Sequence, residues 1–209
     1  MRRALVATAV LGWACGSSSH KPAVAPTPAA ANAAGAAAGT RMSTVGHEQY
    51  YDIDGASAGA LRDQIHRLGP RDGSGQAGDA LTVWNIESNY VVAPSADGCA
   101  LRNIQVTLDL TLTLPRWTPP STAAPRLLES WRSYLQHLKL HEAGHRAIAE
   151  QNARALAAAL TGLRAPTCQE LTDSASRTAE RILADGRARN RAYDIDTKHG
   201  QTQGVVLEP

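Results

Sequence analysis

The clearest periodic pattern in the chain lies in residues 101–114, where apolar and polar positions alternate. The first set is aliphatic: Ile104, Val106, Leu108, Leu110, Leu112 and Leu114. The second set carries amide, hydroxyl and carboxylate groups: Asn103, Gln105, Thr107, Asp109, Thr111 and Thr113. Because successive side chains of a strand point to opposite faces, this pattern predicts a long strand with one buried and one solvated face.

Two other segments are predicted as strands. Residues 80–92 are rich in β-branched and aromatic side chains and alternate in part, and residues 48–53 form a shorter candidate. Asp97-Gly98 favours a turn between the strand at 80–92 and the long strand.

The remaining patterns are helical. Ser57 can cap a helix that reaches about Leu68, and a long helix is predicted to open between Ser121 and Pro125 and to end near Leu160. A further helix follows Cys168. Its apolar face consists of Leu171, Ala175, Thr178, Ile182 and Gly186. The tail from Tyr193 onward is predicted as a loop, and the order of elements indicates an α+β fold.

The long predicted helix contains the motif H-E-x-x-H. At about 100° per residue, its two histidines continue one apolar face. That face consists of Trp131, Tyr134, Leu138, His141, His145, Ile148, Asn152 and Leu156. Glu142 lies at the edge of the same sector, whereas Glu150 lies on the opposite side and is predicted to be solvated.

The motif has a chemical reason for its spacing. Histidines at i and i+4 share one helix face and can bind a single zinc ion, and the glutamate between them can take a proton from a zinc-bound water. His141 and His145 are therefore predicted as zinc ligands and Glu142 as the general base. The plainer interpretation is that both histidines are hydrogen-bonded core residues and Glu142 a surface residue.

A catalytic zinc usually has three protein ligands and one open position, so a third ligand is required. His199, in a glycine-flanked part of the tail, is ranked first because imidazole is a favoured zinc ligand. Asp194 or Asp196 follows, and then Asp185. His137, one turn before the motif, is predicted to lie at the surface or beside the site rather than on the metal.

The first residues carry the pattern of an export signal. Arg2 and Arg3 precede an apolar run to Ala14 that is too short to span a membrane as a permanent helix. Cleavage after Ala14 fits the small-x-small rule. Residues 1–14 are therefore predicted to be a signal peptide.

Cleavage there leaves Cys15 as the first mature residue, which resembles a bacterial lipoprotein whose cysteine is acylated. Residues 15–41, rich in Ala, Pro and Ser, are predicted to be a flexible tether, and residues 42–209 a single folded domain. These features predict a protein anchored in the bacterial cell envelope by lipid on Cys15, with ordinary secretion as the alternative.

The number of cysteines bears on the cellular compartment of the protein, and its charge bears on the kind of partner it binds. With Cys15 acylated, Cys99 and Cys168 remain, and they can form a disulfide in an oxidising compartment. The chain has 21 Lys and Arg against 19 Asp and Glu, and loss of the signal leaves a near-neutral chain. The sequence contains no basic patch that would indicate a nucleic-acid partner. The sequence does not specify the oligomeric state.

Segments spread along the chain share a recognisable pattern: residues 51–53, 69–72, 82–84, 114–117, 141–145 and 193–200, with Cys99 and Trp131. Together they resemble a bacterial family catalogued as predicted secreted zinc-dependent proteases, and otherwise as a domain of unknown function. The resemblance runs from about His47 to the C-terminus, and its most telling parts are residues 141–145 and the closing Thr197-x-His199-Gly200 with Gln203-Gly204. It implies a zincin-like α+β domain, in which a small sheet with antiparallel pairing packs on the HExxH helix and a second, C-terminal helix. It also favours His199 as the third ligand.

The predicted function is hydrolysis of peptide bonds in a peptide or protein substrate by a zinc-dependent metallopeptidase. Tyr193, close to His199 in sequence, is a candidate for stabilising the oxyanion, and packing is its alternative role. The rival from another class is a non-catalytic envelope lipoprotein whose metal site is structural or vestigial and which binds a partner. A second rival is hydrolysis of a non-peptide bond such as a cell-wall amide.

Overall fold

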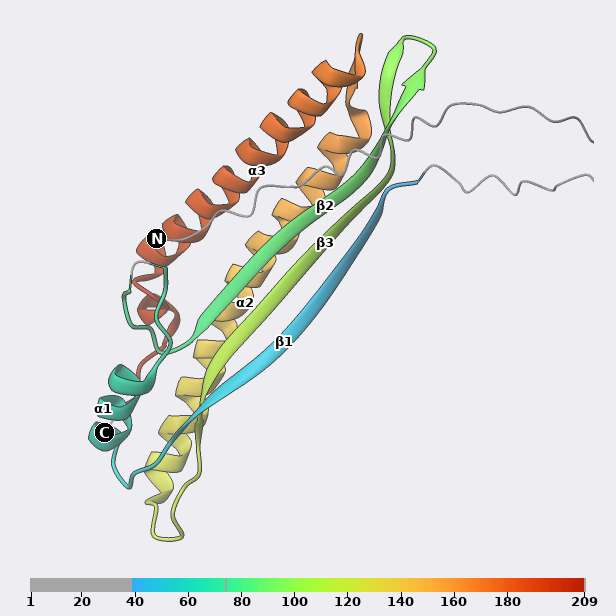
Figure 1. The fold of residues 1–209 in the computed structure, drawn as a ribbon. Helices are drawn as coiled ribbons and strands as arrows, with labels where there is room; N and C mark the ends of the chain where they lie inside the picture. Colours follow the sequence, from blue (N-terminus) through green and yellow to red (C-terminus); the bar gives the residue numbers. More distant parts are fainter. Residues whose placement is uncertain (1–38, 74, 209) are drawn as a thin grey trace, which may run out of the picture.

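The computed structural model describes residues 39–208 apart from residue 74. The predicted signal peptide, Cys15 and nearly all of the predicted tether lie outside the described residues. The described chain forms a mixed sheet and three α-helices, which confirms the α+β prediction (Figure 1).

The sheet has β3 (Gly98–Trp117) at its centre. β1 (Arg41–Ile53) runs parallel to it on one side, and β2 (Leu81–Ser95) runs antiparallel on the other. A two-residue strand, β4 (Arg164–Ala165), pairs with β3 at Cys99 and Ala100. β3 is therefore an internal strand, and the edges that could accept an extended peptide belong to β1 and β2.

The alternating pattern of β3 is confirmed. Of its six aliphatic positions, five are buried and Leu112 is half-buried, whereas the alternate positions are half-buried or exposed. The turn at Asp97-Gly98 joins β2 and β3 as predicted. β1 begins seven residues earlier than position 48, where its predicted strand began. Its side chains before Tyr51 are all exposed, so backbone pairing with β3 extends the strand where no apolar pattern marks it.

Two long helices cover one face of the sheet. α2 (Pro125–Gly162) and α3 (Cys168–Thr197) lie side by side, and α1 (Ala58–Leu68) packs near one end of α2 (Figure 1). The Ser57 hydroxyl accepts a hydrogen bond from the amide of Ala60, so the predicted cap of α1 is confirmed. None of the described helices combines the length and the apolar character that crossing a membrane requires.

The core has two parts along α2. Toward the C-terminal end of α2, Leu156 and Leu160 pack with Val106 and Leu108 of β3 and with Leu171 of α3. The second part lies toward the N-terminal end of α2 and consists of Ile65, Leu114, Trp131, Tyr134, Leu138, Val205 and Leu207, among others. The HExxH motif lies between these two apolar clusters, so its side chains project into a protected part of the molecule.

The prediction of a loop from Tyr193 is wrong, because α3 continues to Thr197. It ends at Lys198, which has a left-handed backbone (φ 50°) and is followed by a single 3₁₀ turn, η1 (Gln201–Gln203). The last two turns of α3 have few apolar residues and mostly exposed side chains, so their sequence lacks the periodic face that marks a helix. This correction changes the site, because Tyr193 and Asp194 project from a rigid helix.

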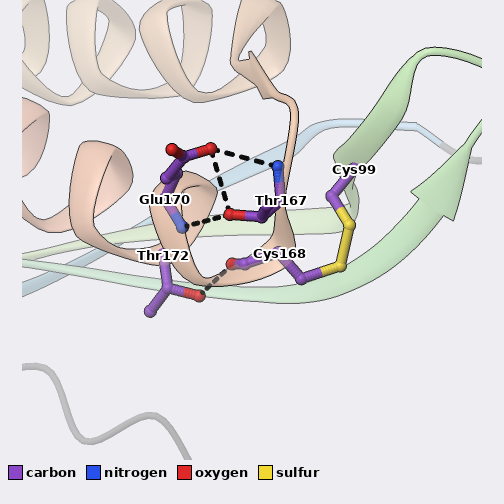
Figure 2. Close-up of a disulfide and its surroundings, with 5 residues drawn as sticks. All are labelled: Cys99, Thr167, Cys168, Glu170 and Thr172. Carbon is purple, nitrogen blue, oxygen red and sulfur yellow. Dashed lines mark hydrogen bonds between the residues drawn. A yellow bond between two sulfur atoms is a disulfide. The ribbon is translucent and has the colours of Figure 1, made fainter.

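Cys99 and Cys168, the two cysteines that the sequence analysis paired, form a disulfide (Figure 2). It links the start of β3 to the first residue of α3. That helix start is also held by a capping box, in which Thr167 and Glu170 each accept a hydrogen bond from the other's amide. The beginning of α3 is therefore fixed to the sheet covalently and by hydrogen bonds.

We expect loss of this disulfide to lower the free energy of unfolding substantially. The bonded cysteines are 69 residues apart, and closing a loop of that size restricts the unfolded chain by about 4 kcal/mol. Urea unfolding of the protein and of a Cys99→Ser/Cys168→Ser variant measures the difference. An unchanged unfolding midpoint would show that the bond does not form in solution.

Candidate metal centre

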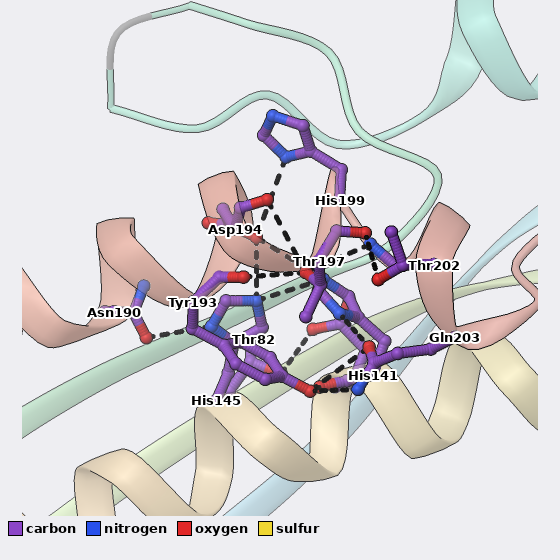
Figure 3. A network of polar contacts seen from close by, with 12 residues as sticks. Thr82, His141, His145, Asn190, Tyr193, Asp194, Thr197, His199, Thr202 and Gln203 are labelled. Carbon is purple, nitrogen blue, oxygen red and sulfur yellow. Dashed lines mark hydrogen bonds and ion pairs between the residues drawn. The ribbon is translucent and has the colours of Figure 1, made fainter.

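The three defining residues of the HExxH motif are buried in the middle of α2. His141, Glu142 and His145 are 4%, 4% and 6% exposed. The interpretation of Glu142 as a surface residue is therefore wrong. The histidine faces point toward α3 and the C-terminal residues, from which their polar partners come (Figure 3).

Each histidine has its Nδ1 atom beside a side-chain amide oxygen. Nδ1 of His141 lies 2.9 Å from Oε1 of Gln203, and Nδ1 of His145 lies 2.9 Å from Oδ1 of Asn190. Because an amide oxygen only accepts hydrogen bonds, this pairing places the proton on Nδ1 and leaves the Nε2 lone pair free. Orientation of this kind by a partner on the other ring nitrogen is typical of metal-ligating histidines.

The two Nε2 atoms converge on Asp194, which projects from the last turns of α3. They lie 3.2 Å from each other, and Oδ1 of Asp194 lies 3.0 Å from Nε2 of His145 and 3.4 Å from that of His141. His141, His145 and Asp194 are here called the metal group. In the described part of the chain, they are the one set of three potential metal-binding side chains whose ligand atoms all lie within 4.8 Å of one another. Three lone-pair atoms at these distances repel one another unless a positive charge lies between them.

A tetrahedral zinc ion fits this arrangement. Ligand atoms about 2.0–2.2 Å from zinc lie roughly 3.3–3.6 Å from one another in a tetrahedron. The three measured separations, 3.0, 3.2 and 3.4 Å, are close to those edges. Two imidazole nitrogens and a carboxylate oxygen can therefore hold zinc with little movement, and one coordination position remains for water or substrate.

Charge in the group favours a cation as well. Burial alone would raise the pKa of Asp194, but the adjacent side chains of His141 and His145, which can carry positive charge, outweigh it and hold that pKa well below its ordinary value. Burial likewise lowers the pKa of His145, but the adjacent Asp194 outweighs it and raises that pKa. Asp194 is thus ionised and attracts positive charge to Nε2, whether a proton or a metal ion.

His199, ranked first as the third ligand, lies outside the group. Its Nδ1 atom is 3.6 Å from Oδ1 of Asp194, and its side chain is 62% exposed (Figure 3). The extension of α3 explains the difference, because helical spacing brings Asn190 and Asp194 to one face and leaves His199 beyond the helix end. Among the described residues, the third member of the group with His141 and His145 is therefore Asp194, and His199 lies next to it.

The other residues weighed for the site lie away from the metal group. Asp185 and Asp196 are exposed, and Asp185 lies 4.0 Å from Arg181 in an ion pair. Glu150 pairs with Arg146 and Arg154 on the outer side of α2, as its helical position predicted. His137 is half-buried beside Gly204 and is not one of the three grouped residues.

Glu142 is held by a threonine of the neighbouring strand. The hydroxyl of Thr82 in β2 donates a hydrogen bond of 2.6 Å to Oε2 of Glu142, and both side chains are buried. Burial raises the pKa of Glu142, although the Thr82 hydrogen bond partly opposes the rise. A carboxylate whose pKa is raised toward neutrality accepts and returns protons more readily near neutral pH.

Tyr193 supports the histidines and does not face the open cavity. Its ring stacks on His141 at a centroid distance of 5.1 Å and meets the edge of His145 at 4.9 Å. Its hydroxyl lies 3.3 Å from the carbonyl oxygen of His141 and receives a hydrogen bond of 3.0 Å from Nε2 of Gln203. These contacts correspond to the packing alternative, and Tyr193 is not among the residues that line the cavity.

The metal group lies at the base of a cavity of about 510 Å³. The walls come from α1, the loop between α1 and β2, the start of β2 and the C-terminal residues, and include Ile65, Asp79, Leu81 and Val205. Tyr134 of α2 donates a hydrogen bond of 2.9 Å to Asp79, which holds the end of this loop against the helix. The loop arches above the group in Figure 3.

Comparison with known proteins assigns a family. Residues 48–200 match the family described as bacterial protein of unknown function (DUF922). The chain belongs to this family. Searches of curated proteins and of solved structures give no significant match. The match runs from within β1 to just beyond the end of α3 and includes His141, His145 and Asp194.

Sequence reasoning missed three polar partners in this DUF922 domain: Thr82, Asn190 and Gln203. A threonine at an inward position of β2 was visible in the alternating segment, but nothing in sequence connects it with Glu142, 60 residues away. Asn190 lies one helical turn before Asp194, so an extended α3 would have pointed to it. Gln203 is placed by the turn after α3, which has no periodic signal.

Gly144, between Glu142 and His145, makes room for Tyr193. A Cβ atom at this position would lie 2.3 Å from Cζ of Tyr193, so any larger residue must displace the ring. Such displacement would disturb the stacking on His141.

We therefore expect Gly144→Ala to weaken zinc binding by roughly 10–100-fold, as loss of a ligand's supporting contact does, although alanine favours the helix. A competition titration against a zinc-binding dye measures the affinity. Gly162→Ala, at an open position at the end of the same helix, is the matched control, and equal affinities in both variants would contradict the role of Tyr193.

Proposed function

We propose that this protein is a zinc-dependent hydrolase that cleaves peptide bonds, with a zincin-like arrangement of its HExxH helix beneath a small sheet. The observation that carries the proposal is the convergence of Nε2 of His141, Nε2 of His145 and Oδ1 of Asp194 beside a buried glutamate. A nitrogen- and oxygen-ligand set with one open position is typical of catalytic zinc sites.

Each residue has a separate task in the proposed reaction. His141, His145 and Asp194 would hold the zinc, which when bound lowers the pKa of a water molecule and polarises a carbonyl group. Glu142 takes a proton from the attacking water and returns it to the leaving amine, and Thr82 holds the carboxylate in place for both transfers. Gln203 and Asn190 fix the tautomer and orientation of the two imidazole rings.

The edge strand β2 gives the substrate a place to bind. β2 pairs only with β3 in the described sheet, and Leu81 and Thr82 at its start line the cavity of the metal group. An extended peptide can pair with the free edge of a strand through main-chain hydrogen bonds. This position would bring a backbone carbonyl beside Glu142 and the metal ligands.

Two features of the chain support catalysis outside the cytoplasm. A structural zinc site would close its fourth position with a protein ligand, whereas the metal group of the described residues supplies three. The disulfide suits an oxidising compartment, in line with the proposed export signal and lipid anchor at Cys15.

The test is hydrolysis of a quenched-fluorescence peptide library by the full chain. We expect cleavage that a chelator abolishes and added zinc restores. Cleavage of cell-wall amides without cleavage of peptides would replace the proposed substrate class. If the zinc-loaded protein cleaves neither peptides nor cell-wall amides, the result would favour the rival function, a non-catalytic binding protein that contains a metal ion.

A further inference from the structure

A second cavity lies on the other side of Glu142. It has a volume of about 280 Å³ and is bounded by β1, the inner faces of β2 and β3, and α2. Glu142 and Thr82 line both this cavity and the one that contains the metal group. The two cavities therefore adjoin at this hydrogen-bonded pair, and a ligand in either one can reach the glutamate.

Gly46 opens this second cavity. It lies in β1 opposite Leu110 of β3, so it belongs to the face of the sheet that carries the aliphatic core. A Cβ atom added at Gly46 would meet nothing within 4 Å, and its φ is not in the left-handed region. Neither close backbone packing nor backbone conformation requires glycine here, and its effect is to leave space next to Leu110.

The lining combines an aliphatic floor with a cationic rim. Leu110, Leu112 and Ala143 supply apolar surface, and Lys139 and Arg146 lie at the rim on the same side of α2. Arg146 is paired with Glu150, whereas Lys139 has no ion pair among the residues that the structure describes. Glu48, the acidic residue at the β1 side, accepts a hydrogen bond from Tyr50.

We propose that this second cavity is a substrate subsite that takes a bulky aliphatic side chain and binds a neighbouring carboxylate through Lys139. The inference rests on the proposed function, because the substrate residue bound here would lie next to the peptide bond that is attacked by the water activated by Glu142. The apolar floor suits a leucine-like side chain. The unpaired ammonium at the rim suits the carboxylate of a chain end or of an acidic residue that follows.

The direct test uses N-acetyl-leucine, which carries both groups, and N-acetyl-leucinamide, which lacks the charge. Binding to the zinc-free full chain is followed by NMR titration. We expect the amide to bind about threefold more weakly, the size of effect that an exposed ion pair gives. Lys139→Ala should remove that difference and leave amide binding unchanged.

Gly46→Leu fills the cavity and should weaken binding of both compounds by about tenfold or more, since burial of a leucine side chain is worth one to two powers of ten in affinity. Gly59→Leu is the matched control, because a Cβ at Gly59 also meets nothing within 4 Å, and it should bind as the unaltered protein does. Thermal unfolding of both variants verifies that they fold.

Unchanged binding in folded Gly46→Leu would overturn the proposed subsite, even if the zinc-loaded protein hydrolyses peptides. Binding that Gly46→Leu removes, in a protein without hydrolytic activity, would support the subsite and overturn the proposed function instead. An equal affinity for the acid and the amide would overturn the role of Lys139.

Discussion

Replacing Glu142 with glutamine should sharply lower the rate of peptide hydrolysis while zinc remains bound. Glutamine keeps the volume of the buried side chain and can still accept the hydrogen bond from Thr82, but it cannot take a proton from water. Loss of general-base catalysis typically lowers the rate by about 10²–10⁴-fold. Hydrolysis rates and zinc content, measured on the same samples, test both parts of this expectation.

Glu129→Gln is the control for this substitution. Glu129 lies on the same helix, but its side chain is exposed and belongs to neither cavity lining, so activity should be unchanged. Retained activity in Glu142→Gln would remove Glu142 from the mechanism. A parallel loss of zinc would show that the glutamate holds the metal group together and does not act on water.

Replacing Asp194 with alanine should reduce zinc affinity far more than replacing His199. Asp194 supplies the oxygen that lies 3.0 and 3.4 Å from the two Nε2 atoms, whereas His199 contacts the group only through that carboxylate. We expect Asp194→Ala to cost more than the roughly 10–100-fold that loss of a ligand's supporting partner costs, and His199→Ala to stay within that range. Competition titrations of both variants provide the comparison.

Asp185→Ala is the matched control, since Asp185 is an exposed residue of the same helix in an i,i+4 ion pair. Its zinc affinity should equal that of the unaltered protein. A greater loss in His199→Ala than in Asp194→Ala would restore His199 as the third ligand. It would also mean that the turn after α3 closes on the metal when zinc binds.

The parts of the site that the sequence predicted are those that a single helix specifies. His141 and His145 are brought together by the i, i+4 spacing alone, and the apolar stripe on which they lie indicated correctly that they are buried. The strand alternation in residues 101–114 was equally local. In each case the periodicity records which face meets the core.

The third residue depends on where α3 ends, and the sequence does not mark that end. After Gly186 the helix has too few apolar residues for a recognisable apolar face. In its last turns, the Tyr193 hydroxyl contacts the carbonyl oxygen of His141, and the Thr197 hydroxyl donates a hydrogen bond to the carbonyl oxygen of Tyr193. Predicting a loop there moved attention from Asp194 to His199. The amide partners from Asn190 and Gln203 are tertiary contacts, and no periodicity encodes them.

The most direct test of the central claim is the zinc content of the purified full chain after equilibration with zinc and removal of excess metal. The geometry of the metal group predicts one zinc per chain, and none in a variant that combines His141→Ala with His145→Ala. A chain that retains no zinc, or retains it equally in the double variant, would contradict the metal centre and the hydrolytic function proposed from it.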